Sequence, residues 1–187
     1  MNQCYYKLNL PFNVQDINTD KLSELDYLDW TKHTSRVVKA EDWLSDRLLN
    51  FFIDRNMNDL TLLINYCPPN TKGYIHIDGD YTKARPCGIN IPWGSNNSVM
   101  TWFKAHDNVI PKLTITANNK PHIDYDINNV EPIEHAEINS ISLIRTNIPH
   151  QVYNIDPDNA RWCMSIRVNS ITSWISSVIR LNEYLIK

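Results

Sequence analysis

The sequence has little glycine and no long apolar run. Only four of its 187 residues are glycine, and no apolar stretch is long enough to cross a lipid bilayer. Residues 1–13 mix polar and apolar side chains and lack the continuous apolar segment of a signal peptide. We therefore expect a cytoplasmic protein with no membrane partner.

An excess of positive charge is also missing. The chain carries 18 lysines and arginines against 21 aspartates and glutamates, which gives a net charge of −3 at pH 7. Proteins that bind nucleic acid through bulk electrostatics need a positive field, so the composition gives no strong signal for a nucleic-acid partner.

The four cysteines, Cys4, Cys67, Cys87 and Cys163, contain no CxxC pair. Structural zinc sites favour that paired spacing, so we expect reduced thiols rather than a zinc site or a disulfide framework. Asparagine and isoleucine are abundant whereas alanine is scarce, which fits an A/T-rich genome such as a viral one. For a viral protein the expected location is the host cytoplasm.

The overall composition is typical of one globular domain. Hydrophobic residues make up 42% and charged residues 21%, and no repeat or linker divides residues 1–187. We expect an N-terminal strand and helical support in residues 1–58, a β-core in 59–168 and a C-terminal helix in 169–187. Within the first region, the apolar spacing of residues 41–56 predicts a helix.

The β-core is predicted from short apolar segments that alternate with turns rich in Asn, Gly and Pro. Short strands at this interval favour a mainly β fold, an antiparallel sandwich or barrel, with helices at its flanks. The expected strands are 59–66, 73–78, 87–92, 98–104, 112–117, 121–126, 132–138, 141–146, 150–155 and 161–168.

One group of residues has the composition of a metal site. In a strand, His76 and Asp78 point to the same side of the sheet. With His150 from a neighbouring strand they form a set of two imidazoles and one carboxylate, which binds one face of an ion. That arrangement leaves coordination positions open and suits non-haem Fe(II).

A second His-x-Asp motif, His122 and Asp124, competes for this assignment. A double-sheet jelly roll places roughly four strands of about five or six residues between the motif and the last histidine. Residues 125–149 barely hold them, whereas 79–149 hold them easily. The first motif is therefore the predicted ligand pair, and the second is expected on a surface hairpin.

Two arginines lie on the strand predicted over 161–168. Arg161 and Arg167 would share one face with Cys163 and Ser165. A buried arginine is costly unless it meets an anion, and its planar fork fits a carboxylate. We expect Arg161 to bind an anionic cosubstrate, with Arg167 as the second candidate. An ion pair at the rim of the barrel is the alternative for both.

In order along the chain, these residues resemble the Fe(II)/2-oxoglutarate-dependent oxygenases, in particular the prolyl-hydroxylase-like branch. The resemblance covers residues 60–168 and rests on Tyr66, His76-x-Asp78, Arg85, His150-x-Val152 and Arg161. The stretch from Asn90 to Trp93, followed by Trp102 and Phe103, is similar to the aspartyl/asparaginyl β-hydroxylase-like branch.

The resemblance implies a double-stranded β-helix, the cupin-like jelly roll, in which His76, Asp78 and His150 bind Fe(II). Arg161 would hold the distal carboxylate of 2-oxoglutarate, the cosubstrate. Tyr66 would line that pocket, and Arg85 would lie near its mouth. The implied reaction converts 2-oxoglutarate to succinate and hydroxylates a C–H bond, for example in a Pro, Asp or Asn side chain of a protein or peptide, or in a small molecule.

Other readings stay open at this point. No glycine directly precedes Arg161, where many relatives have one. A non-catalytic jelly roll with a binding or structural role, as in viral proteins, is the first alternative. A metal-binding cupin isomerase or dioxygenase that does not use 2-oxoglutarate is the second. The sequence does not fix the substrate, the oligomeric state, or whether residues 104–140 form a lid.

Overall fold

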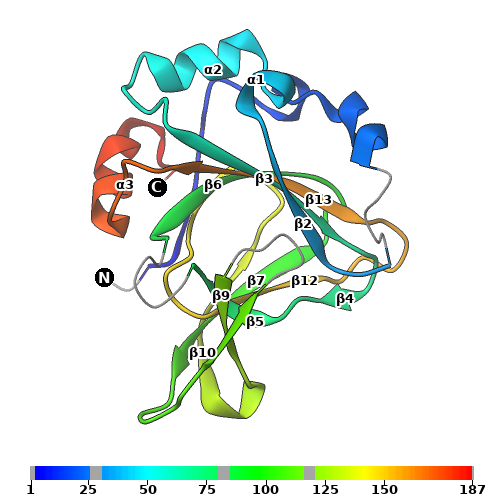
Figure 1. The fold of residues 1–187 in the computed structure, drawn as a ribbon, viewed down its shortest axis with the longest axis vertical. Helices are drawn as coiled ribbons and strands as arrows, with labels where there is room; N and C mark the ends of the chain where they lie inside the picture. Colours follow the sequence, from blue (N-terminus) through cyan, green and yellow to red (C-terminus); the bar gives the residue numbers. More distant parts are fainter. Residues whose placement is uncertain (1–2, 26–30, 80–84, 116–120, 187) are drawn as a thin grey trace.

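Two antiparallel β-sheets face each other in the computed structural model, which describes residues 3–25, 31–79, 85–115 and 121–186 (Figure 1). The first sheet has the strand order β1 (Tyr5–Lys7), β11 (Ser142–Arg145), β6 (Cys87–Gly94), β13 (Arg161–Val168), β3 (Leu60–Cys67) and β2 (Thr34–Val38). The second has the order β10 (Val130–Glu137), β7 (Ser98–Ala105), β12 (His150–Asn154), β5 (Ile75–Asp78), β9 (Pro121–Tyr125) and β8 (Lys112–Ile115), with β4 (Thr71–Lys72) also paired to β12.

The chain passes back and forth between the two sheets. From β3 it crosses to β5, returns to β6 and crosses again to β7; after β10 it runs through β11, β12 and β13 in the same alternating way. The central strands of each sheet are therefore neighbours in space but distant in sequence. This alternation is the winding of a double-stranded β-helix, so the predicted mainly β jelly roll is confirmed.

The hairpin of β8 and β9 is inserted between β7 and β10. It extends the second sheet beyond β5, because β9 pairs with β5 and β8 forms the outer edge. The described part of residues 104–140 thus belongs largely to the second sheet.

Helices cover the outer face of the first sheet (Figure 1). They are α1 (Ala40–Trp43), α2 (Asp46–Ile53) and α3 (Trp174–Arg180), together with the short 3-10 helices η1 (Val14–Asp16), η2 (Thr19–Leu25) and η4 (Asn182–Tyr184). The 3-10 helix η3 (Ile127–Asn129) instead connects β9 to β10 of the second sheet. None of the described helices is long and apolar enough to cross a membrane.

The helix predicted over residues 41–56 is divided in two. Ser45 lies in an extended conformation between α1 and α2, and its hydroxyl accepts a hydrogen bond from the Leu48 amide at 3.2 Å. A serine in this position caps a helix start, so α2 begins anew after it. Its Phe51 and Phe52 then pack on the first sheet.

Strand β13 shows how the fold separates apolar from polar contacts. Met164 and Ile166 are buried in the core shared with the helices, whereas Arg161 and Arg167 line a cavity on the other face. This alternation follows from the two-residue period of a strand. Because the helices occupy the outer face, the inner face is left for a polar site between the sheets.

Candidate metal centre

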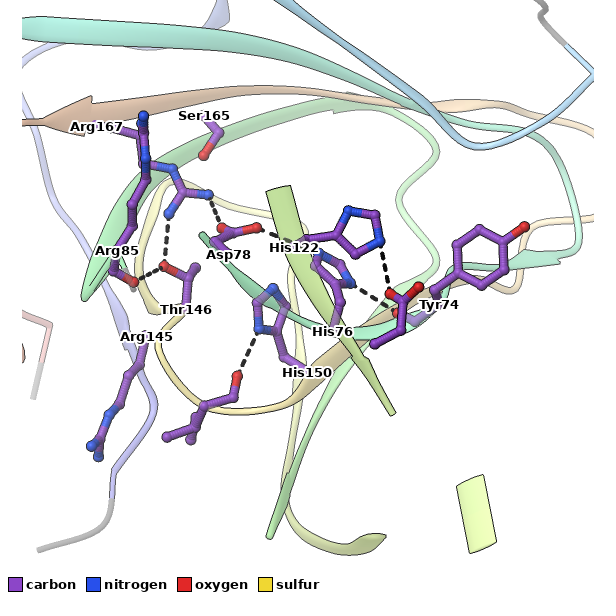
Figure 2. Close-up of polar contacts among 12 residues, drawn as sticks. Tyr74, His76, Asp78, Arg85, His122, Arg145, Thr146, His150, Ser165 and Arg167 are labelled. Atoms are coloured by element: carbon purple, nitrogen blue, oxygen red, sulfur yellow. Dashed lines mark hydrogen bonds and ion pairs between the residues drawn. The ribbon is translucent and has the colours of Figure 1, made fainter. Parts of the chain in front are cut away.

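The structure brings His76, Asp78 and His150 together on the inner face of the second sheet (Figure 2). His150 begins β12 and lies directly opposite His76 of β5 in the strand register. Asp78 follows two residues later on the same face of β5. One ligand atom from each side chain lies within 4.8 Å of those of the other two, a spacing at which all three can bind one ion. The predicted triad is thus assembled in space.

Both imidazoles are oriented by backbone carbonyls. Nδ1 of His76 lies 3.0 Å from the carbonyl oxygen of Tyr74, and Nδ1 of His150 lies 2.9 Å from that of Ile148. A carbonyl oxygen only accepts, so each Nδ1 carries the proton and donates it. Each Nε2 then presents a lone pair, and that of His76 lies 3.4 Å from Asp78 Oδ1. This tautomer is the one that a metal ligand needs.

The Asp78 carboxylate is held from the opposite sheet. Its Oδ2 accepts a hydrogen bond from Nη2 of Arg167, and Nη1 of the same guanidinium donates to Thr146 Oγ1 at 2.8 Å (Figure 2). Burial alone would raise the pKa of Asp78, but the Arg167 charge and the two histidines lower it well below its usual range. Asp78 is therefore a carboxylate, with Oδ1 directed toward His76.

The two histidines differ in their tendency to bind a proton. Burial, together with the charge on His76, lowers the pKa of His150 to about 4. Burial also disfavours the charged form of His76, but the hydrogen bond and charge of Asp78 outweigh it and raise that pKa. In the absence of a metal, His150 is therefore neutral at pH 7, whereas His76 binds a proton more readily than an ordinary histidine.

A cavity of about 540 Å³ lies between the two sheets above the triad. The four residues predicted to share one face of β13 all line this cavity: Arg161, Cys163, Ser165 and Arg167. The cavity is large enough for a small cosubstrate together with a side-chain-sized group.

Arg161 is a buried cation of this cavity with no carboxylate partner among the described residues. Arg161 is only 4% exposed, and its Nε and Nη2 atoms have no hydrogen-bond partner among the described residues. An unpaired buried guanidinium is unfavourable unless an anion fills the space in front of it. Arg167, in contrast, is occupied by Asp78.

The other two predicted cosubstrate residues lie in different places. Tyr66 borders the cavity, but its ring packs on Trp162, with centroids 4.7 Å apart, on the face of the first sheet that carries Met164 and Ile166. Arg85 is not among the described residues that line the cavity. Its backbone amide donates to the Asp78 carbonyl at 2.9 Å, and its carbonyl accepts from Thr146 Oγ1 at 2.8 Å. The structure thus places Arg85 behind Asp78, where it supports the end of β5.

The second motif lies on a hairpin, as predicted, but its side chains face the cavity rather than solvent. On β9, His122 lies opposite Asp78 and Asp124 lies opposite His76, and both side chains line the cavity. The His122 side chain is only 15% exposed. Spacing excluded this pair from the ligand set but could not show that β9 would pair with β5.

A further cavity residue that the sequence did not indicate is His33. Its Nε2 lies 2.7 Å from the Cys67 sulfur, and both side chains line the cavity. Burial lowers the pKa of His33 to about 4 and raises that of Cys67 to about 11, so both groups are neutral at pH 7. His33 directly precedes β2, which no apolar alternation had predicted.

No protein-family model and no curated protein matches the sequence. Among solved structures, the chain is similar to oxalate decarboxylase of Bacillus subtilis, with 9% identity and a TM-score of 0.35 over 74% of this chain and 26% of that chain. Vicilin of Solanum melongena has 10% identity and a TM-score of 0.34 over 88% of this chain and 31% of that chain. Peruvianin-I, a cysteine peptidase from Thevetia peruviana latex, has 13% identity and a TM-score of 0.37 over 90% and 91%.

The chain spans about a quarter of the length of oxalate decarboxylase. Similarity at these identities and TM-scores carries no information about function. The assignment of the fold rests on the strand order, and that of the site rests on the geometry of the triad.

Proposed function

We propose that this protein is an Fe(II)- and 2-oxoglutarate-dependent oxygenase that hydroxylates a C–H bond of its substrate. The observation that carries the proposal is the presence, in one cavity, of the His76–Asp78–His150 triad and the buried guanidinium of Arg161, which has no carboxylate partner among the described residues. Two imidazoles and one carboxylate suit a metal ion that must keep positions open for other ligands. The buried guanidinium suits a cosubstrate that carries a carboxylate.

Each residue has a definite task in this proposal. His76, Asp78 and His150 hold the ion through Nε2, Oδ1 and Nε2, and Arg167 keeps Asp78 ionised. Arg161 binds the distal carboxylate of 2-oxoglutarate by two parallel hydrogen bonds. When bound, the iron and the 2-oxo acid supply the oxygen chemistry, which the protein itself does not perform.

Met100 and Val152 give the same cavity apolar walls, which limit the access of water to the metal. The substrate is a protein, a peptide or a small molecule, with a Pro, Asp or Asn side chain as the family-level candidate.

Anaerobic titration of the purified protein with Fe(II) and 2-oxoglutarate tests the proposal. A 2-oxo acid chelated to Fe(II) gives a visible charge-transfer band. We expect this band for the wild-type protein, its loss in His76→Ala and a large decrease in 2-oxoglutarate affinity in Arg161→Ala with metal affinity retained. A loss of 2-oxoglutarate affinity in Arg167→Ala with metal affinity retained, and no such loss in Arg161→Ala, would move the carboxylate site to Arg167.

The same titration separates the alternatives. Metal binding without the band, in a folded protein, would indicate a metal-binding cupin that does not use 2-oxoglutarate. Absence of both would indicate a non-catalytic jelly roll with a binding or structural role.

A further inference from the structure

The inserted hairpin of β8 and β9 adds a polar wall to the cavity beside the triad. The register places Asp124 next to His76, and Lys112 next to Asp124. Two residues further along the strands, His122 lies next to Asp78, and Thr114 lies next to His122. All four hairpin side chains line the cavity. The sheet therefore continues from the metal ligands into a second set of hydrogen-bonding groups.

His122 and Asp124 lie outside the triad. The only group of three metal-binding side chains within the described residues is His76, Asp78 and His150. The His122 ring is nevertheless close, with its centroid 5.5 Å from that of His76. A molecule that extends from the metal along the sheet would meet His122 and Asp124 first.

The free hydrogen-bonding capacity of this wall is mostly that of an acceptor. Nε2 of His122 lies 2.7 Å from Asp124 Oδ1. That oxygen is buried and makes no hydrogen bond among the described residues, so the Asp124 carboxylate keeps lone pairs for the donors of a ligand.

Thr114 adds a second hydrogen-bonding group without a partner to this wall of the cavity. Its hydroxyl oxygen is buried and has no hydrogen-bond partner in the described part of the chain. A buried hydroxyl without a partner is unfavourable, so a ligand group is expected to satisfy it. Together with Asp124 it forms a site for a group that carries several N–H bonds.

We propose that the β8–β9 hairpin face is a substrate subsite that binds an amide or amine group through Asp124 and Thr114, beside the His122 ring. The assignment of this group to the substrate rests on the proposed oxygenase function. Lys112, the one cation among the described residues of this wall, is exposed, whereas Asp124 Oδ1 is buried. A carboxylate in contact with Asp124 Oδ1 would be repelled, and a group without N–H bonds would leave that oxygen without a donor. The subsite therefore selects substrates with a neutral amide or a cationic amine near the hydroxylated carbon.

Saturation-transfer NMR on the metal-free protein and on the Zn(II)-loaded protein tests the subsite without any turnover. The probes are N-acetyl amino-acid N-methylamides in matched pairs, Gln against Glu and Lys against norleucine. We expect the Gln and Lys compounds to bind at least about tenfold more tightly than their partners, because each makes a hydrogen bond to a charged acceptor. In Asp124→Asn, the preference is expected to fall below about threefold.

Asp107→Asn is the matched control, because it removes the same charge from an exposed turn outside the cavity lining. The control should retain the wild-type preference, and thermal melting should show that both variants are folded. Equal binding within the pairs, no saturable binding of the Gln and Lys compounds, or an unchanged preference in Asp124→Asn would each overturn the subsite. A preference that is present while the Fe(II)–2-oxoglutarate band is absent would leave the subsite standing and reject the oxygenase.

Discussion

Two identical tripeptides, His76-Ile77-Asp78 and His122-Ile123-Asp124, lie side by side on neighbouring strands of the second sheet. Both motifs line the same cavity, but different side chains contact them. Asp78 receives Arg167 from the opposite sheet, and His76 faces His150. In the second motif, His122 and Asp124 contact each other at 2.7 Å.

The difference shows what converts a common sequence pattern into a metal site. The first motif gains a third ligand and an ionised carboxylate from strands that are distant in sequence. The second motif lies one strand further from β12, at a place where no third ligand joins it within the described chain. Tertiary neighbours, rather than the tripeptide, thus give the first motif, and not the second, the geometry of a candidate metal site.

The largest expected difference is in metal affinity, between a variant that lacks a histidine of the triad and one that lacks the histidine of the second motif. His150→Ala is expected to lower the affinity for Fe(II) or Zn(II) by more than about 100-fold, because it deletes one of three ligands. His122→Ala should change it by less than about threefold. Isothermal titration calorimetry under anaerobic conditions measures both. A larger loss in His122→Ala would mean that the second motif holds the metal.

Much of the fold could be predicted from the sequence because strand segments carry local signals. Every predicted strand of the 59–168 region is present, and the alternation of polar and apolar residues placed Arg161 and Arg167 on one face correctly. Strand β2 was missed because its five residues lack a clear alternation. The break at Ser45 was missed because the apolar spacing continues across it.

The neighbours of the site were harder to predict. Strands β5 and β9 are separated by more than 40 residues, and nothing in either segment specifies that they pair. The contact of Arg167 with Asp78 crosses from one sheet to the other. Spacing could therefore select the ligand motif, but it could not show which side chains surround it.

Loss of Arg167 should affect stability more than loss of the charge in the second motif. Arg167→Ala leaves the half-buried Asp78 carboxylate without its partner, and we expect the free energy of unfolding of the metal-free protein to fall by about 3 kcal/mol. Asp124→Asn should cost less than about 1 kcal/mol. Urea denaturation measures both.

A double-mutant cycle with Asp78→Asn identifies the cause. If the ion pair explains the loss, Arg167→Ala should cost much less in the Asp78→Asn background. An equal cost in both backgrounds would show that Arg167 acts through packing or through Thr146 instead.

A smaller effect is expected when the arginine is displaced rather than removed. A Cβ atom at Gly88 would lie 3.0 Å from both Arg167 Cζ and Ser165 Oγ, which is closer than normal contacts allow. Gly88→Ala should therefore shift the guanidinium away from Asp78 and lower metal affinity by about tenfold. In Gly73→Ala the new methyl group meets the His33 ring instead, at 3.2 Å, so metal affinity should be retained. Calorimetric titration of both variants compares them, and equal affinities would argue against a role of Arg167 in positioning Asp78.

The two motifs should also differ in how they respond to acid. The pKa of His76 is raised, so His76 stabilises the metal-free protein below the unfolded-state value of about 6.5 and loses that contribution as pH rises through its folded-state pKa. The pKa of His122 is lowered, chiefly by burial, so its contribution is present above about 6.5 and is lost as pH falls. In His122→Gln, the free energy of unfolding should therefore fall less between pH 7 and pH 5 than in the wild-type protein. In His76→Gln, it should fall more.

NMR titration of the imidazole resonances follows the two groups directly. In the metal-free protein, His76 should titrate above and His122 below the ordinary histidine range. After addition of Zn(II), His76 should stop titrating because a bound metal replaces its proton, while His122 should continue to titrate. If both histidines stop together, both motifs bind the metal, and the distinction between a metal-binding motif and a hydrogen-bonding motif fails.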